Sequence, residues 1–372
     1  MSTLITGATG FIGQRLAAAL LEEGRDLVVL ARGRDADEAR ARVEASLPGA
    51  PTNGARRKVH VCLGRLEEPG LGLSPADRER ILADCDEIIH CGASVRFDLP
   101  LEQARAVNLG GTVGLLDLAR ERARRAGRIH FHYVSTAFVA GNRTDVVLEG
   151  DLDDRAGHKN SYERTKFEAE LETRRAAAEL PVTVYRPSVV VGDSSTGITA
   201  GFNALYWPAR VYALGLWRTC PGRADASLDV VPVDFVVNAI LRLRKQPAAA
   251  GRSFHLTAGP QGAVTVGQVA DLLHRTFPSR KPVRFVDPAP WLRYFQPVLR
   301  RIALGRIRQV IQTGEYYIPY FTRNPLFDNT GTQDLLRDSG IQVPSFLRYA
   351  EQLFAYCVDT DWGRRPASGT RV

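Results

Sequence analysis

The most constraining feature of this chain is a glycine-rich segment almost at its start. Gly7, Gly10 and Gly13 follow Gly-x-x-Gly-x-x-Gly spacing directly after an apolar run that ends at Thr6. The spacing predicts a strand that turns sharply at Gly7 and a helix that packs closely at Gly13. The free amides and positive dipole end of such a helix favour a phosphate group. We therefore expect a dinucleotide site with contacts from Thr6, Gly7, Thr9, Gly10, Phe11, Ile12 and Gly13.

Strand and helix signals alternate after this segment. Ile12, Leu16 and Leu20 recur at helical spacing and Gly24 is placed to end the helix, which favours a cofactor turn over a purely structural one. We expect strands over 3–6, 27–31, 59–63, 87–91, 129–134 and 182–191, and the main helices over 101–126 and 162–179. This alternation predicts an α/β fold of the Rossmann type, with a doubly wound parallel sheet.

A smaller C-terminal substrate lobe is predicted because the alternation loosens beyond residue 193. Asp234 is placed to cap a helix, and residues 253–257 resemble a strand followed by a helix capped by Thr265, so the chain returns to the sheet. We expect a nucleotide-binding domain over 1–192 with about 229–277, and a lobe over about 193–228 and 278–363. Residues 48–57 are predicted as a surface loop and 364–372 as a flexible tail.

Composition limits the class of protein. A chain of 372 residues with 44% hydrophobic content can bury one large core and an appended lobe. The formal net charge of +8 favours acidic partners such as a phosphorylated cofactor, coenzyme A or an acidic carrier protein, although solvated helix faces also explain arginine runs. Nucleic acid is not expected, because basic and acidic residues are interleaved. The five cysteines match no zinc spacing, so we predict reduced core thiols and no metal site.

No apolar run reaches the ~18 residues that a membrane span needs, and Met1 is followed by a strand pattern instead of a leader. We therefore expect a soluble cytoplasmic protein. Residues 291–311 form a basic amphipathic helical pattern. It predicts either a plain packed helix or one that contacts a membrane surface or a carrier protein.

The candidate catalytic pair is Tyr162 and Lys166, which lie four residues apart on one face of a predicted helix. A nearby ammonium favours the phenolate and is expected to lower the proton affinity of the tyrosine, which makes it a proton donor. Ser135 and Thr136 end the fifth strand and offer a hydroxyl to a substrate carbonyl. A surface Tyr/Lys pair is the alternative, but the order of glycine turn, Ser-Thr and Tyr-x-x-x-Lys argues against it.

That order resembles the extended short-chain dehydrogenase/reductase superfamily, from Thr3 to about Leu336. Six segments are similar to its fatty acyl-CoA reductase and thioester-reductase branch: 90–98 (HCGASVRFD), 107–112 (VNLGGT), 134–141 (VSTAFVAG), 185–192 (YRPSVVVG), 229–234 (DVVPVD) and 327–330 (FDNT). The resemblance implies that Tyr162 is the catalytic acid and that Lys166 modulates it and binds the nicotinamide ribose. It implies Thr136 as the assisting hydroxyl, with Ser135 as the alternative.

Further roles follow only from the resemblance. Asn108 matches the position that braces the active-site helix, the alternative being a polar residue that faces solvent. Cofactor contacts are implied at Cys91, Gly92, Ala93, Pro187, Ser188 and Val189. Aromatic and apolar residues between 202 and 217 are expected either to wall an acyl channel or to pack in the core.

The cofactor is expected to be NADPH. The second strand ends without the acid that would bind a ribose 2′-hydroxyl, and Arg32, Arg34 and Arg42 follow instead. A guanidinium can hold a 2′-phosphate with two charge-assisted bonds, although solvated arginines are the alternative. Relatives usually carry Gly-Asp-Leu after the third strand, whereas this chain has Gly64-Arg65-Leu66. Either Arg65 adds to the phosphate contacts, or the adenine contact beside Leu66 is made by other groups.

The resemblance implies an NADPH-dependent reductase of an acyl thioester, carried on coenzyme A or an acidic carrier protein and reduced to the aldehyde, with reduction on to the alcohol left open. One alternative acts on a free ketone, aldehyde or alcohol of a natural-product pathway. Another is a sugar-nucleotide epimerase or dehydratase. The third is a non-catalytic regulator that senses NADPH. A monomer or a homodimer is expected.

Overall fold

The computed structural model describes residues 2–47, 59–202 and 205–365. At its centre lies a seven-stranded parallel sheet with strand order β12-β7-β5-β4-β1-β2-β3. Its strands are β1 Ser2–Thr6, β2 Asp26–Ala31, β3 Val59–Leu63, β4 Cys85–His90, β5 His130–Val134, β7 Val182–Pro187 and β12 Ser253–Leu256. The predicted loop at 48–57 and residues 366–372 of the predicted tail lie outside the described residues. The order reverses between β1 and β4. In folds of this class a binding crevice lies outside the carboxyl ends of the two strands at such a point, and we use the word crevice for this place.

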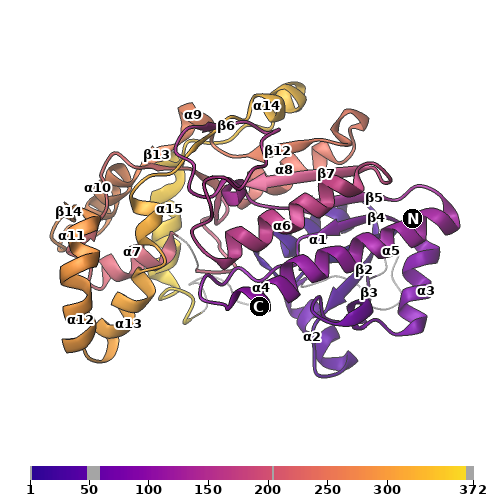
Figure 1. Ribbon diagram of the computed structural model, residues 1–372, viewed down its shortest axis with the longest axis horizontal. Helices are drawn as coiled ribbons and strands as arrows, with labels where there is room; N and C mark the ends of the chain where they lie inside the picture. Colours follow the sequence, from indigo (N-terminus) through magenta and orange to yellow (C-terminus); the bar gives the residue numbers. More distant parts are fainter. Residues whose placement is uncertain (1, 48–58, 203–204, 366–372) are drawn as a thin grey trace.

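Helices cover both faces of the sheet (Figure 1). One face packs against α1 Phe11–Glu22, α2 Ala36–Ser46 and α8 Val233–Leu243. The other face packs against α3 Pro75–Asp84, α5 Gly111–Ala126 and α6 Ser161–Ala176. The predicted doubly wound α/β fold is confirmed.

Local signals explain where these helices begin and end. Gly24 has a φ of +88° and follows the last turn of α1, as the sequence predicted. Asn160 caps α6 by accepting a hydrogen bond from the Glu163 amide. The predicted helix over 101–126 begins as α4 Leu101–Arg105, passes through a π turn over Ala106–Gly110 and continues as α5. The Thr265 cap is also confirmed, because it forms a capping box at the start of α10 Val266–Thr276.

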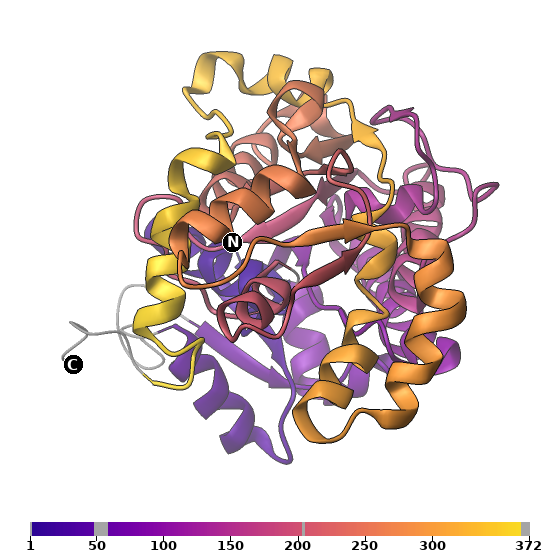
Figure 2. The same ribbon diagram turned by 90° about the vertical axis from the view of Figure 1, so that its left-hand side faces the viewer.

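A second hydrophobic core lies beside the sheet (Figure 2). It joins α7 Tyr206–Ala213, α10 and α15 Phe346–Asp359. Farther out, α11 Pro288–Pro290, α12 Gln296–Ile302 and α13 Gly305–Gly314 form a helical hairpin. The predicted division of the chain into two units stays a prediction, although α10, inside 229–277, packs in this second core.

Short strand pairs and helices complete the connections between the two cores. The pairs are β6 Val146–Val147 with β15 Leu326–Phe327, β8 Val189–Val191 with β11 Val230–Pro232, β9 Thr219–Pro221 with β14 Arg284–Val286, and β10 Ser227–Leu228 with β13 Val264–Thr265. The remaining helices are α9 Gly259–Gly262 and α14 Thr330–Leu336. In the described part of the chain, none of the helices has both the length and the apolar character needed to cross a bilayer.

Three predictions about the fold are wrong. The strand predicted over 182–191 is two strands, β7 in the main sheet and β8 in a separate pair, because the chain breaks at Ser188 and its hydroxyl donates to Asp229. Asp234 does not cap α8, since its carboxylate accepts from the amide and hydroxyl of Ser194. The amphipathic pattern over 291–311 is not one helix, because α12 ends at Ile302 and α13 begins at Gly305.

Candidate active site

The glycine turn lies at the crevice between β1 and β4. Gly7 has a φ of +73°, and a Cβ at that position would lie 2.7 Å from the Gly92 backbone nitrogen. A Cβ on Gly13 would lie 2.1 Å from the Gly7 carbonyl oxygen. Only glycine fits either position, so the turn brings β1, α1 and the residues after β4 into direct contact. Thr9 and Gly10 are exposed there.

The N-terminus of α1 suits a bound anion. Among the described residues no side chain caps it, and its first turn contains no acid. Its first amides therefore point toward the crevice without a protein acceptor. Together with the glycine cradle, this arrangement fits the pyrophosphate of a dinucleotide.

A buried hydrogen-bond chain joins this turn to the helix that precedes α5. Thr6 Oγ1 lies 2.7 Å from His90 Nδ1, and His90 Nε2 lies 3.1 Å from Thr112 Oγ1. Thr112 donates its own proton to the Asn108 carbonyl oxygen at 2.6 Å, so its oxygen must accept from His90 Nε2–H. His90 Nδ1 then accepts from the Thr6 hydroxyl. Burial lowers the pKa of His90 well below its ordinary value, which keeps the ring in this neutral tautomer.

Asn108 fastens the active-site helix to the loop after β4. Its side-chain oxygen accepts from the Ser94 amide at 2.7 Å, and its amide nitrogen donates to the Ser94 carbonyl at 3.1 Å. The same nitrogen donates to the Thr165 hydroxyl of α6 at 3.0 Å. Asn108 is buried, so the alternative of a solvent-facing polar residue is wrong.

Tyr162 lies at the start of α6, against Phe97 and Thr136. The centroids of the Tyr162 and Phe97 rings are 5.9 Å apart. Burial raises the pKa of Tyr162 to about 12, while a hydrogen bond with the Thr136 side chain acts in the opposite direction. The expected lowering of the tyrosine's proton affinity by Lys166 is therefore wrong for this chain, because burial outweighs every favourable contact. At neutral pH the phenol carries its proton.

Lys166 is buried one turn further along α6. Its ammonium donates to the Val134 carbonyl at 2.8 Å and lies 4.1 Å from the centre of the Tyr133 ring. Burial lowers its pKa to about 7, although Glu170 and Cys91 act to raise it. The side chain thus lies at the carboxyl end of β5, beside the crevice. Because its pKa is about 7, the ammonium titrates near neutral pH.

The two candidate hydroxyls of the fifth strand face different groups. Ser135 donates to Glu170 at 2.6 Å, inside a cluster in which Glu170 also forms a fully buried ion pair with Arg186. Burial acts to raise the pKa of Glu170, but Arg186 and its other hydrogen-bond partners lower it overall. Thr136 caps a 3-10 turn over Ala137–Ala140, and its side chain acts to lower the pKa of Tyr162. Only Thr136 is placed beside the phenol.

The arginines after β2 differ in their contacts. Arg34 is held by Glu38 at 2.7 Å. Arg32 and Arg42 are exposed, and neither side chain has a hydrogen bond or ion pair among the described residues. Arg65 donates to the Gly33 carbonyl at 3.3 Å, so it lies next to the end of β2.

Arg65 is partly neutralised, because Glu68 lies 3.5 Å and Glu67 3.9 Å from its guanidinium. Leu66 lies beside the crevice, since a Cβ on Gly92 would be 3.0 Å from Leu66 Cδ1.

The remaining predicted cofactor residues lie along the carboxyl ends of β4 and β7. The Cys91 amide donates to the Thr6 carbonyl, and the Gly92 amide donates to the Thr6 hydroxyl at 3.1 Å, so the segment 91–93 follows the glycine turn directly. The Pro187 carbonyl accepts a 3.4 Å bond from the Thr136 hydroxyl. Ser188 donates to buried Asp229 at 2.5 Å, which holds the segment 187–189 in place.

An aromatic wall connects the lobe to Tyr162. Phe97 packs against Tyr317 and Tyr320, with centroid distances of 6.1 and 5.7 Å. Trp207 of α7 stacks on Tyr317 at 4.8 Å. We call Phe97, Trp207, Tyr317 and Tyr320 the aromatic wall. Of the predicted apolar segment 202–217, Leu205, Tyr206 and Tyr212 are buried in the second core, and Trp207 joins this wall.

The wall is anchored to the start of α6. Tyr320 donates to Glu163 at 2.6 Å and accepts from Asn160 at 2.8 Å. Burial raises the pKa of Glu163, whose carboxyl is next in sequence to Tyr162. The lobe is therefore tied by hydrogen bonds to the residue beside the candidate proton donor.

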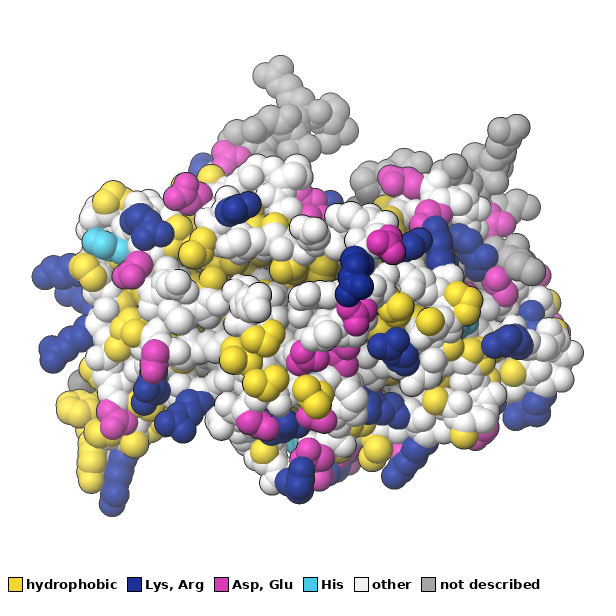
Figure 3. Space-filling view, turned by 90° about the horizontal axis from the view of Figure 1, so that it is seen from above, with side chains coloured by type: hydrophobic (Ala, Val, Ile, Leu, Met, Phe, Trp, Pro, Cys, Tyr) yellow, Lys and Arg dark blue, Asp and Glu magenta, His cyan; other side chains and the backbone are white. Residues whose placement is uncertain are grey.

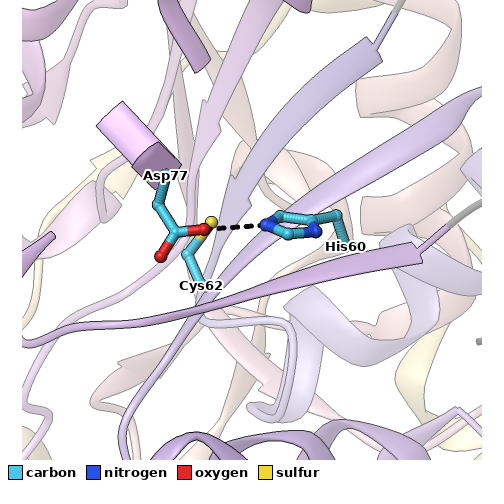
Figure 4. A group of neighbouring side chains, drawn as sticks. All are labelled: His60, Cys62 and Asp77. Atoms are coloured by element: carbon cyan, nitrogen blue, oxygen red, sulfur yellow. Dashed lines mark hydrogen bonds and ion pairs between the residues drawn. The ribbon is translucent and has the colours of Figure 1, made fainter. Parts of the chain in front are cut away.

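His60, Cys62 and Asp77 form a separate cluster between β3 and α3 (Figure 4). Their donor atoms all lie within 4.8 Å of one another. His60 Nε2 is 2.8 Å from Asp77 Oδ1, and the Ser74 hydroxyl is 2.8 Å from Asp77 Oδ2. Burial raises the pKa of the Cys62 thiol, which hydrogen-bonds Asp77. These bonds belong to the capped start of α3, so we assign the cluster no metal role.

Sequence reasoning missed several residues that build the site: His90, Thr112, Glu170, Asp229, Phe97 and Tyr320. His90, Phe97, Thr112 and Asp229 lie inside the segments that resemble the reductase branch, so the sequence marked these positions but gave them no role. Glu170 and Tyr320 had no local signal, because their partners lie far away in the sequence.

Comparisons with known proteins agree with this geometry. Residues 5–240 match a family model described as the male sterility protein. Fatty acyl-CoA reductase wat of Drosophila melanogaster is 30% identical over 275 residues, which are 64% of this chain and 52% of that protein. Carboxylic acid reductase of Segniliparus rugosus is 29% identical over 80% of this chain and 27% of its own length. The chain spans 52% to 64% of the first three curated reductases it matches.

Solved structures extend the likeness to the lobe. The terminal R domain from the myxalamid PKS-NRPS biosynthetic pathway superposes with a TM-score of 0.82 at 26% identity, over 98% of this chain and 92% of that one. A thiolation-reductase di-domain from an archaeal non-ribosomal peptide synthetase shares the fold, with a TM-score of 0.73 at 19% identity over 97% of this chain and 76% of that one. The chain belongs to the male sterility protein family, in the fatty acyl-CoA reductase and thioester-reductase branch of the extended short-chain dehydrogenases/reductases.

Proposed function

We propose that this protein is an NADPH-dependent reductase that converts an acyl thioester, carried on coenzyme A or a carrier protein, to an aldehyde. The observation that supports it most is the position of the Tyr162 phenol, which lies beside Thr136 and against Phe97 of the aromatic wall. Relatives named fatty acyl-CoA reductase and carboxylic acid reductase support the substrate class.

The proposal gives separate roles to the cofactor-binding residues and to the two hydroxyls. The nicotinamide cofactor supplies a hydride when bound, and Thr6, Gly7, Gly10 and Gly13 are placed to hold its diphosphate. The hydroxyls of Thr136 and Tyr162 hold the oxygen of the thioester carbonyl as negative charge develops on it. Tyr162, protonated at neutral pH, gives its proton to that oxygen.

The product of this step is a hemithioacetal. It releases the thiol when its carbon–sulfur bond breaks and the carbonyl re-forms, which leaves the aldehyde. The aromatic wall supplies an apolar face for the acyl chain next to the reacting carbon.

Substitutions of the arginines after β2 test the proposed preference for NADPH over NADH. Arg32→Gln is expected to raise KM for NADPH by about 10- to 100-fold, because a charge-assisted bond to the 2′-phosphate contributes about 1.5–3 kcal/mol. KM for NADH should change little. Arg34→Gln is the matched control, since Glu38 already holds that guanidinium. Equal effects of the two variants on both cofactors would remove the argument for NADPH.

The substrate class is tested by following NADPH at 340 nm with a long-chain acyl-CoA, a free long-chain aldehyde and a ketone. The proposal predicts oxidation with the acyl-CoA, reduced about 10²–10⁴-fold in Tyr162→Phe, which lacks the acidic proton. Tyr356→Phe, which changes a partly exposed tyrosine of α15, should retain full activity. Turnover with free carbonyls alone would favour the other dehydrogenases, and NADPH binding without turnover would favour a regulator.

A further inference from the structure

The helical hairpin of α11 to α13 carries an unusual local charge. Residues 288–314 contain five arginines and no aspartate or glutamate, whereas the whole chain has 41 acidic residues against 49 lysines and arginines. The arginines are Arg293, Arg300, Arg301, Arg306 and Arg308. Arg300 pairs with Glu315, but Arg293, Arg301 and Arg308 are exposed and have no ion pair among the described residues. The hairpin therefore presents a positive surface.

The same hairpin exposes large apolar side chains. Leu292, Tyr294, Phe295 and Val298 are 42% to 59% exposed, and Leu304, between α12 and α13, is 80% exposed. Among the described side chains of this segment, Gln296 and Ala303 are buried, and Trp291, Leu299, Val310 and Ile311 are half-buried. The hairpin thus has a partly covered inner face, and it exposes further large apolar side chains that a packed surface helix would turn toward the core. Clustered exposure of this kind marks a surface that contacts another apolar phase or partner.

The shape of the hairpin favours a membrane over a folded partner. It projects from the outer end of the lobe (Figures 1 and 2); Figure 3, which views the molecule from above, shows basic, hydrophobic and some acidic side chains at that end. A convex tip that ends in Leu304 can enter a soft headgroup layer, whereas a folded protein would have to offer a matching hollow. Tyrosine, phenylalanine and arginine are the residues that such interfaces select.

We propose that this hairpin docks the protein on the surface of a bilayer that contains anionic lipids. Leu304, Phe295 and Val298 enter the boundary between headgroups and acyl chains, and the unpaired arginines contact lipid phosphates. Binding is peripheral. The inference goes beyond the proposed reaction and does not depend on it.

The position of the hairpin adds a functional consequence. α13 ends at Gly314, three residues before Tyr317, which belongs to the aromatic wall beside Tyr162. A docked hairpin would thus bring the apolar approach to Tyr162 close to the lipid surface. This consequence rests on the proposed function, whereas the docking itself does not.

The test is co-sedimentation of the full chain with vesicles of phosphatidylcholine alone and with about 30% phosphatidylglycerol. The wild type is expected to bind the anionic vesicles and to be released by about 0.5 M salt. Arg301→Gln/Arg308→Gln should weaken the partition coefficient about 30-fold, because each basic residue near such a surface contributes about a factor of five. Leu304→Ser should weaken it at every salt concentration.

Matched controls lie elsewhere on the surface. Arg124→Gln/Arg242→Gln removes two exposed arginines without an ion pair among the described residues, and Val358→Ser changes a 47% exposed side chain of α15. Both should bind like the wild type, and circular dichroism verifies that every variant folds. Equal binding to neutral vesicles, no binding, or equal losses in control and hairpin variants would overturn the proposal. So would failure on vesicles combined with saturable, hairpin-dependent binding to an acidic acyl carrier protein.

Discussion

Lys166 makes the stability of this protein depend on pH in a predictable way. Its pKa is about 7 in the fold, against an ordinary value of 10.5, because burial disfavours the ammonium. Between these two values the unfolded chain binds a proton that the folded chain does not, so the free energy of unfolding rises with pH. Integration gives a gain of about 2 kcal/mol from pH 7 to pH 9, and almost no change below pH 7.

The perturbation is Lys166→Met, which keeps an apolar chain of similar length and removes the titrating group. Urea unfolding of both proteins at several pH values gives the difference in their unfolding free energies. The buried cysteines also titrate at alkaline pH, but they do so in both proteins and cancel in this difference. The wild type should gain about 2 kcal/mol relative to the variant between pH 7 and pH 9. Lys245→Met, on an exposed lysine, should show no such trend. Parallel pH profiles for wild type and Lys166→Met would refute the account of this side chain.

Three further substitutions separate effects on folding from effects on the reaction. Gly13→Ala should destabilise the fold by about 1–3 kcal/mol and weaken NADPH binding, since the new Cβ meets backbone atoms. Thermal unfolding and cofactor titration measure the two effects. Gly150→Ala is the control, because a Cβ at that position meets open space. Ser135→Ala should lower the unfolding free energy by about 1–3 kcal/mol with kcat retained, because Glu170 loses a buried donor. Thr136→Ala should lower kcat by about 10²–10³-fold, and it should also lower the unfolding free energy by about 1 kcal/mol, because the turn over Ala137–Ala140 loses its cap. If Ser135→Ala proves the slower enzyme, the two hydroxyls have been assigned the wrong way round.

Much of the fold could be predicted because its signals are local. Gly7, Gly13 and Gly24 each mark a backbone position that only glycine suits. The succession of strands and helices along the chain follows from the alternating apolar runs. The break at Ser188 escaped prediction, because the hydrogen bond that holds it comes from Asp229, 41 residues away. Asp234 shows the same limit, since Ser194 competes for the carboxylate that local rules assign to a helix cap.

The candidate site shows where local reasoning ends. Spacing correctly placed Tyr162 and Lys166 on one helix, one turn apart. Spacing could not show that the Lys166 ammonium donates a hydrogen bond to the Val134 carbonyl, nor that burial raises the pKa of Tyr162. The choice between Ser135 and Thr136 depends on which neighbour each hydroxyl faces, and that is decided by Glu170 of α6.

The central claim is that Tyr162 gives a proton to a thioester carbonyl as that carbon receives a hydride. Its most direct test is mass spectrometry of the aldehyde formed from a long-chain acyl-CoA and NADPH deuterated at the transferable position. The account predicts one deuterium at the aldehyde carbon with the wild type, and formation at least about 100-fold slower with Tyr162→Phe at unchanged NADPH affinity. Labelled aldehyde formed by Tyr162→Phe at the wild-type rate would contradict it.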